Sequence, residues 1–171
     1  MSFTKQTSPH GSLVALSTMK DEGPTVVEWV AHHLAVGFTE LMVYTNDCSD
    51  GTDALLKRLQ AMDIGVHHRE NLIPEGMKPH PSMLKSAAEE ELIINSDWLL
   101  VLDADEFMTI SHHSGTLDGL VTDLNAMNAS AIVLTWRIFG SSGVRAWSRA
   151  PITDQFTRAA PEFWNKGWGT K

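Results

Sequence analysis

The stretch Trp98-Leu99-Leu100-Val101-Leu102-Asp103-Ala104-Asp105-Glu106-Phe107 decides how the rest of the chain is interpreted. Its apolar first half is typical of a short strand buried on both faces of a parallel sheet. Carboxylates follow at once. Because residues i and i+2 of an extended segment point the same way, Asp103 and Asp105 are predicted to reach one spot at the edge of the sheet.

This pair of carboxylates predicts a metal site. Two carboxylates on one spot repel each other unless a cation lies between them. Mg²⁺ and Mn²⁺ prefer oxygen ligands and keep positions open for phosphate oxygens. We therefore predict that Asp103 and Asp105 hold Mn²⁺ or Mg²⁺, which would bind a nucleoside diphosphate and stabilise it as a leaving group. The alternative is an acidic turn that only caps the next element.

Around this stretch the chain alternates between strands and helices. Apolar runs predict strands at residues 13–17, 41–44, 65–68, 98–102 and 131–135, and helical spacing predicts helices at 26–34, after Asp50, at 82–94 and at 118–127. Residues 70–81 hold three prolines and are predicted to form a loop. This order predicts an α/β fold, a mainly parallel sheet of about five strands with helices on both faces. Ligands of such folds bind beyond the carboxyl ends of the strands.

Polar turns follow the first two predicted strands. The turn that begins at Thr18 opens a helix whose backbone N–H groups could face an anion, and Lys20 could neutralise a phosphate there, although a solvated lysine is the alternative. Glu22 suits a nucleobase or a sugar hydroxyl better than a phosphate. After the second strand, Asp47 is placed to accept hydrogen bonds from a base or ribose, or only to form the turn. Asp50 and Thr52 are predicted to satisfy backbone N–H groups at the start of the next helix.

Three pairs of adjacent histidines stand out, at 32–33, 67–68 and 112–113. Neighbours in sequence point apart on a helix or strand, so the pairs are predicted to be poor chelates and no zinc site is expected. One of His32 and His33 is predicted to face the core and to hydrogen-bond there. One of His112 and His113 is a weaker candidate for the pocket.

Composition limits the classes of partner. The chain of 171 residues carries a formal charge of −8, so no excess of Lys and Arg exists for nucleic-acid binding. Its single cysteine, its polar first residues and the lack of a long apolar run predict a cytoplasmic protein without a membrane span. The length predicts one domain over residues 1–171, with a core at 12–147 and an irregular aromatic tail at 148–171.

From about Val14 onward, the chain resembles bacterial glycosyltransferases related to family 2. The motifs that carry the resemblance are Lys20-Asp21-Glu22-Gly23-Pro24, Glu28-Trp29-Val30-Ala31-His32-His33, Gly37-Phe38, Asn46-Asp47-Cys48-Ser49-Asp50-Gly51-Thr52, Asp103-Ala104-Asp105-Glu106-Phe107 and Trp136-Arg137-Ile138-Phe139-Gly140-Ser141-Ser142-Gly143. The resemblance implies a GT-A fold and a nucleoside-diphosphate-sugar donor, often a UDP-sugar, for transfer to an acceptor hydroxyl.

The resemblance also assigns roles to residues. It implies that Asp105 is the direct metal ligand and that Asp103 binds ribose or supports the metal. Together with the turns, it gives a predicted donor-binding set of Thr18, Lys20, Glu22, Asp47 and Asp103. The segment from Trp136 to Gly143 would line the acceptor side, through Trp136, Phe139 and Ser141.

Two departures from the family leave alternatives open. Members of this branch continue past the position of Lys171, so the chain is expected to lack a C-terminal part, and Glu162 is only a weak candidate for the base that activates the acceptor. One alternative is therefore a nucleotide-sugar-binding module without catalysis. Another is a phosphatase or phosphotransferase with Asp103 as its nucleophile, although Phe107 stands where those enzymes carry a hydroxyl or β-branched residue.

Overall fold

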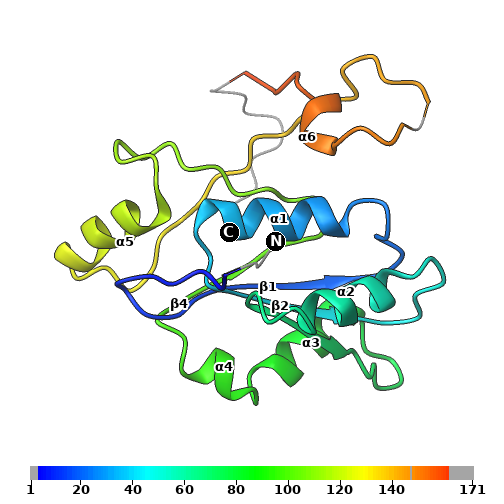
Figure 1. The fold of residues 1–171 in the computed structure, drawn as a ribbon, viewed down its shortest axis with the longest axis horizontal. Coiled ribbons are helices and arrows are strands. Elements are labelled where there is room, and N and C mark those ends of the chain that lie inside the picture. The colour runs from blue at the N-terminus through cyan, green and yellow to red at the C-terminus, as the bar shows by residue number, and fades with distance from the viewer. Residues whose placement is uncertain (1–3, 147, 162–171) are drawn as a thin grey trace. The chain divides into compact units, whose positions relative to one another are not determined.

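The structure is a computed structural model that describes residues 4–146 and 148–161 (Figure 1). The chain divides into two compact units, with the boundary between Asn128 and Ala129. Each unit is described by itself below. The sequence placed its change of character later, after residue 147, and the single domain stays a prediction.

The first unit is built on a parallel sheet. Its strands are β1 (Leu13–Met19), β2 (Glu40–Thr45), β3 (Val66–Glu70) and β4 (Trp98–Val101), in the order β3-β2-β1-β4. All three pairings are parallel, with Val14 opposite Glu40, Leu41 opposite Val66, and Leu13 opposite Trp98. The predicted α/β class with a parallel sheet is therefore confirmed.

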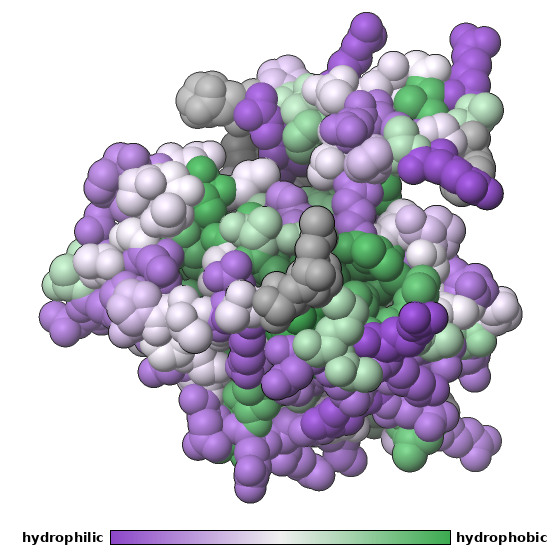
Figure 2. All heavy atoms as spheres, viewed as in Figure 1, coloured by the Kyte–Doolittle hydropathy of each residue, from purple (hydrophilic) through white to green (hydrophobic). Residues whose placement is uncertain are grey.

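Helices cover both faces of this sheet. They are α1 (Val26–Val36), α2 (Thr52–Gln60), α3 (Pro79–Ala87), α4 (Glu91–Ile94) and α5 (Leu117–Ala126). Side chains alternate along β1, so Ala15 joins the core cluster of Trp29 in α1, while Leu16 joins that of Met83 in α3. Residues of α2 and α5 belong to the Trp29 cluster. Figure 1 shows α1 on one side of the sheet and α3 and α4 on the other, and Figure 2 shows mainly hydrophilic side chains over α3 and α4.

The strand order defines where a ligand of such a fold binds. The chain adds β2 and then β3 on one side of β1, and afterwards places β4 on the other side. The direction of strand addition thus reverses between β1 and β4. In open α/β sheets this reversal opens a crevice at the carboxyl ends of the two strands. The residues that follow Met19 and Val101 therefore lie at the carboxyl ends of the two strands where this crevice is expected.

The sheet differs from the prediction in its number of strands. In the described part of the chain it has four strands, and the predicted fifth strand at 131–135 is wrong. Ile132 and Val133 are 38% and 70% exposed. A β-favouring sequence forms a strand only where a neighbouring strand offers a ladder, so propensity alone misassigned this segment. As a consequence β4 is an edge strand, and Leu99 is 41% exposed where burial on both faces was predicted.

The third helical region also differs from the prediction. The predicted loop at 70–81 ends earlier, because α3 begins at Pro79, and proline is well tolerated in the first turn of a helix. The predicted helix at 82–94 is interrupted at residues 88–90. There the backbone of Glu90 is extended. Its carboxylate accepts two hydrogen bonds from Arg69, from Nε to Oε1 at 2.5 Å and from Nη2 to Oε2 at 3.0 Å. This bidentate ion pair holds the break in place.

The second unit has little regular structure. Its described residues contain one short helix, α6 (Ile152–Gln155), and an antiparallel bridge between Phe139 and Ala159. The bridge is closed by hydrogen bonds from Gly140 N to Arg158 O at 3.0 Å and from Ala160 N to Ile138 O at 2.7 Å. Across the described parts of both units, none of the helices has the length and apolarity that a membrane span requires.

Candidate functional site

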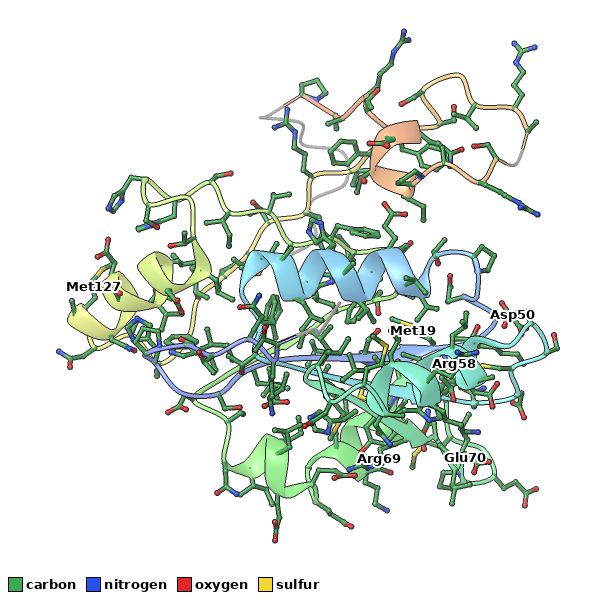
Figure 3. The ribbon with its side chains drawn as sticks, in the orientation of Figure 1. Met19, Asp50, Arg58, Arg69, Glu70 and Met127 are labelled. Carbon is green, nitrogen blue, oxygen red and sulfur yellow. The ribbon has the colours of Figure 1, made fainter. Side chains whose placement is uncertain are left out.

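The turns after β1 and β2 are joined by hydrogen bonds. Asp21 Oδ1 accepts from Ser49 N at 2.6 Å, and Gly23 N donates to Asp50 Oδ2 at 2.7 Å. Glu22 N donates to Thr52 Oγ1 at 2.8 Å. Figure 3 labels Met19, the last residue of β1, and Asp50 at the same end of the sheet. Two separate polar segments of the sequence thus form one surface at the carboxyl edge.

Asp50 is a structural residue of this surface, as predicted. Its Oδ1 accepts from Thr52 N at 3.0 Å and Thr52 Oγ1 at 2.6 Å, at the first residue of α2. Burial, which would raise the pKa of Asp50, is outweighed by the hydrogen bonds from Thr52 and Gly23, so this pKa lies below its ordinary value. Asp21 and Asp47 both have left-handed backbones, with φ of 56° and 48°, a conformation that aspartate tolerates better than most residues.

The turn after β4 does not continue the strand. Leu102 N still donates to Leu16 O at 2.9 Å, but Glu106 N then donates to Asp103 O at 3.1 Å, and Asp103 N donates to Glu106 Oε2 at 2.9 Å. The extended backbone assumed for Asp103 to Asp105 is not observed, because a turn begins at Asp103, and the prediction that both carboxylates reach one spot stays a prediction. Ala104 packs against the core, and Asp105 is exposed.

Helix α1 holds this turn from behind. Trp29 Nε1 donates to Glu106 O at 3.0 Å, and the His32 ring nitrogen Nε2 lies 2.7 Å from Met108 O. Met108 N donates to His33 Nε2 at 3.3 Å. Sequence reasoning missed this clamp, although Trp29, His32 and His33 stand at i, i+3 and i+4, the spacing that gathers side chains on one helix face.

His33 is neutral in this arrangement. It is fully buried, with Nδ1 2.8 Å from Trp29 O, while Nε2 accepts from Met108 N, so the proton is assigned to Nδ1. Burial lowers the pKa of His33 to about 4. The Phe107 ring lies edge-on to His32 and stacked on His33, with centroids 5.2 and 6.0 Å apart. The prediction that one of the two histidines is a core residue is confirmed by His33.

Negative charge gathers between β1 and β4. Burial raises the pKa of Glu22 above its ordinary value, a hydrogen bond from Thr25 Oγ1 at 3.1 Å lowers it, and the charges of Asp105, Asp50 and Asp21 raise it further. The negative charge of Asp105, which follows β4, therefore acts on the carboxyl group of Glu22, which follows β1. This coupling brings together two residues that are 83 positions apart in the sequence, at 22 and 105.

The other predicted site residues fall into four groups. Lys20 and Asp47 lie side by side at the surface, with Nζ 3.9 Å from Oδ2. The Thr18 hydroxyl is buried and has no hydrogen-bond partner among the described residues. Trp136, Phe139 and Ser141 belong to the second unit, where Trp136 and Phe139 are 44% and 52% exposed. Glu162 lies outside the described residues.

The carboxylates of the edge have the oxygen chemistry that a hard divalent cation prefers, although among the described residues their ligand atoms do not all lie within 4.8 Å of one another. The carboxyl edge offers oxygen ligands from Glu22, Asp103 and Asp105, and Lys20 is the cation predicted beside them. Repulsion that raises the pKa of one carboxyl is relieved when a cation binds between the groups. Comparisons of the chain with protein-family models, with curated proteins and with solved structures find no match. Function is therefore inferred from these residues.

Proposed function

We propose that the carboxyl edge of the sheet binds a nucleoside-diphosphate sugar together with Mn²⁺ or Mg²⁺, and that the chain is the donor-binding part of a glycosyltransferase of the GT-A fold. A UDP-sugar is the favoured donor. The observation that carries this proposal is the strand-order reversal between β1 and β4, because acidic residues follow both strands at their carboxyl ends and the charge of Asp105 contributes to the raised pKa of Glu22. That reversal is where open α/β sheets bind nucleotides.

The negative charge at the carboxyl edge of the sheet favours a ligand that binds together with a metal ion. A diphosphate is anionic, and acidic side chains at this edge would repel it if no cation lay between them. Asp105, with Asp103 beside it, would hold the cation, which when bound would balance the charge on the departing diphosphate. Asp105 is exposed, so its carboxylate is accessible to such an ion.

The remaining residues of the edge suit the rest of the donor. Glu22, whose pKa is raised, suits a hydrogen bond with a sugar hydroxyl or a base N–H. Asp47 projects from a left-handed turn with its side chain 75% exposed, which leaves its carboxylate accessible to a ribose or base. Lys20 is 53% exposed and lies close enough to Asp47 to add one positive charge near the phosphates.

In the transfer step, an acceptor oxygen would bond to the anomeric carbon of the donor while the bond from that carbon to the diphosphate oxygen breaks. The leaving diphosphate takes the electron pair of the broken bond, and a base removes the acceptor proton. An in-line attack inverts the anomeric centre. The acceptor role of Trp136, Phe139 and Ser141, which belong to the second unit, stays a prediction from the sequence.

A thermal-stability panel tests the proposal. The chain is melted with UDP, GDP, CDP or dTDP compounds, each with and without Mn²⁺. A ligand at a hundred times its dissociation constant stabilises the fold by about 2.7 kcal/mol, which is a readily measured rise in melting temperature. We expect one nucleotide to stabilise the chain only when Mn²⁺ is present. Stabilisation by none of the pairs, or hydrolysis of p-nitrophenyl phosphate that depends on Asp103, would contradict the proposal.

A further inference from the structure

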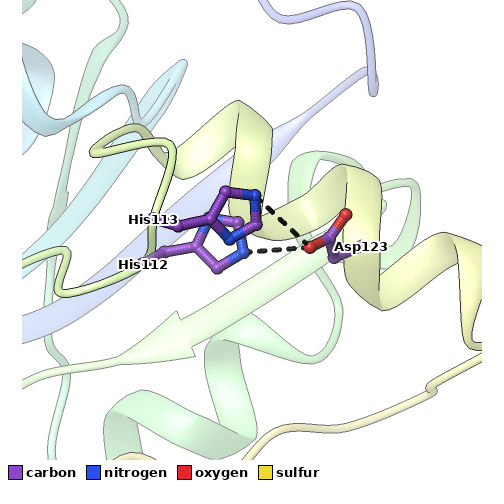
Figure 4. A group of neighbouring side chains, drawn as sticks. All are labelled: His112, His113 and Asp123. Atoms are coloured by element: carbon purple, nitrogen blue, oxygen red, sulfur yellow. Dashed lines mark hydrogen bonds and ion pairs between the residues drawn. The ribbon is translucent and has the colours of Figure 1, made fainter.

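A second cluster of ligand atoms lies at the far end of the loop that carries Asp103 and Asp105. His112 and His113 end this loop, and both rings face Asp123 of α5 (Figure 4). His112 Nε2 lies 3.1 Å from Asp123 Oδ2, and His113 Nε2 lies 4.0 Å from the same oxygen. In the described part of the chain, this is the one group of three such ligand atoms that all lie within 4.8 Å of one another.

The backbone explains why two adjacent histidines converge. The sequence predicted that they would point apart, as neighbours do on a helix or strand. Residues 112–114 instead form a turn, in which Gly115 N donates to His112 O at 2.9 Å. The two imidazole centroids are therefore only 3.9 Å apart. The expectation of a poor chelate fails for this pair because its backbone is neither helical nor extended.

The three ligand atoms lie within 4.8 Å of one another, and two of their distances compare with those around a tetrahedral ion. With bonds of about 2.0–2.1 Å, the ligand atoms of a Zn²⁺ ion lie about 3.3–3.4 Å apart. The His112–Asp123 distance is already close to this value. The His113 side chain is 77% exposed, so it can move the few tenths of an ångström that the His113–Asp123 distance needs.

A neighbouring hydroxyl orients the first histidine. Ser114 N donates to His112 Nδ1 at 3.3 Å, and Ser114 Oγ lies 2.7 Å from the same nitrogen. When Nδ1–H donates to the hydroxyl, the lone pair of Nε2 is left for a metal, which is the arrangement that metal-binding histidines normally have. When Nδ1 instead accepts from Ser114, Nε2–H donates to Asp123 and the cluster is an ordinary ion pair.

We propose that His112 Nε2, His113 Nε2 and Asp123 Oδ2 bind one Zn²⁺ ion, with water in the fourth position. Imidazole nitrogens favour zinc, whereas the all-oxygen edge around Asp105 favours Mg²⁺ or Mn²⁺. The ion would fix the loop to α5 at its end, as α1 fixes it at Glu106 and Met108. This site is independent of the proposed sugar transfer.

Calorimetric titration of the chelator-treated chain with Zn²⁺ tests the proposal. We expect one Zn²⁺ per chain, bound in the presence of excess Mg²⁺. His113→Ala should abolish this binding, and Ser114→Ala should weaken it about tenfold by removing the orienting hydroxyl. His80→Ala, a change at a histidine of α3, is the matched control and should bind Zn²⁺ as the wild type does.

Circular dichroism separates loss of the ligand from loss of the fold. Because His113 is exposed, the His113→Ala chain should keep the wild-type spectrum. Zn²⁺ binding that is unchanged in folded His113→Ala would overturn the proposal, as would a wild-type chain that binds no Zn²⁺. Co²⁺ adds a second test, because it should give the visible absorption of a tetrahedral site in the wild type and lose it in His113→Ala.

Discussion

The two halves of the carboxyl edge are held in opposite ways. In the turns after β1 and β2, the aspartate carboxylates themselves stabilise the turns, since Asp21 and Asp50 accept hydrogen bonds from the facing turn. In the turn after β4 the backbone is fastened instead, by Trp29, His32 and His33 of α1, and Asp105 remains exposed. The comparison teaches that an aspartate in a motif is a candidate ligand where other groups do the work of holding its turn.

The largest expected effect concerns the clamp behind the turn of β4. His33 has a pKa of about 4 in the folded chain and near 6.5 when unfolded, so between these values only the unfolded chain binds the proton. Stability is therefore expected to fall as the pH drops from 6.5 to 4, by about 3 kcal/mol, and to lose nothing more from this group below pH 4. Urea unfolding measured at a series of pH values checks this.

The His33→Gln chain is the comparison for that titration. Glutamine offers an acceptor for Met108 N and a donor for Trp29 O, but it does not titrate. The free energy of unfolding of this variant should depend less steeply on pH between 6.5 and 4. The difference in slope should correspond to one proton fewer taken up on unfolding. Equal slopes in the two chains would show that the contact between α1 and Met108 does not depend on a neutral histidine.

An intermediate effect is expected for the carboxylate that joins the turns after β1 and β2. Asp50→Ala removes the acceptor of Gly23 N and Thr52 N and should cost about 1–2 kcal/mol, as loss of a helix cap does. Asp50→Asn keeps an acceptor oxygen and should recover part of this loss. If Asp50→Ala melts like the wild type, Asp50 does not stabilise these turns.

The smallest single contribution concerns one hydrogen bond between α1 and the turn after β4. Trp29→Phe keeps an aromatic ring in the core but loses the bond to Glu106 O, which should cost about 1 kcal/mol plus the loss from the smaller ring. Metal-dependent nucleotide binding should weaken more in this variant than in Asp50→Asn. Calorimetric titration of both variants with nucleotide and Mn²⁺ makes this comparison. A larger loss of binding in Asp50→Asn than in Trp29→Phe would place the metal-binding side chains in the turns after β1 and β2.

Much of the fold could be predicted because its elements carry local signals. Gly37 ends α1 with φ of 120° and donates to His33 O and Leu34 O, as a glycine stop does. The strand at 131–135 could not be judged in this way, since strand formation depends on a partner far away in sequence. The start of α3 at Pro79 was missed because proline both breaks helices and begins them.

The candidate site could be predicted in its residues but not in its geometry. The polar segments after the strands marked the carboxyl edge, and the hydrogen bonds of Asp50 follow from a cap pattern. The turn at Asp103 and the clamp by α1 depend on tertiary contacts that no local pattern specifies, above all Trp29 with Glu106, 77 residues apart. The convergence of His112 and His113 depends on a turn that the sequence did not indicate.

Nucleotide binding by an Asp105 variant tests the central claim most directly. UDP is titrated calorimetrically, with and without Mn²⁺, into the wild type, Asp105→Asn and Asp53→Asn, where Asp53 is a control carboxylate paired with Lys57 on α2. We predict metal-dependent binding in the wild type and the control, and an affinity about a hundredfold or more lower in Asp105→Asn. An Asp105→Asn chain that binds UDP and Mn²⁺ as tightly as the wild type would contradict the account.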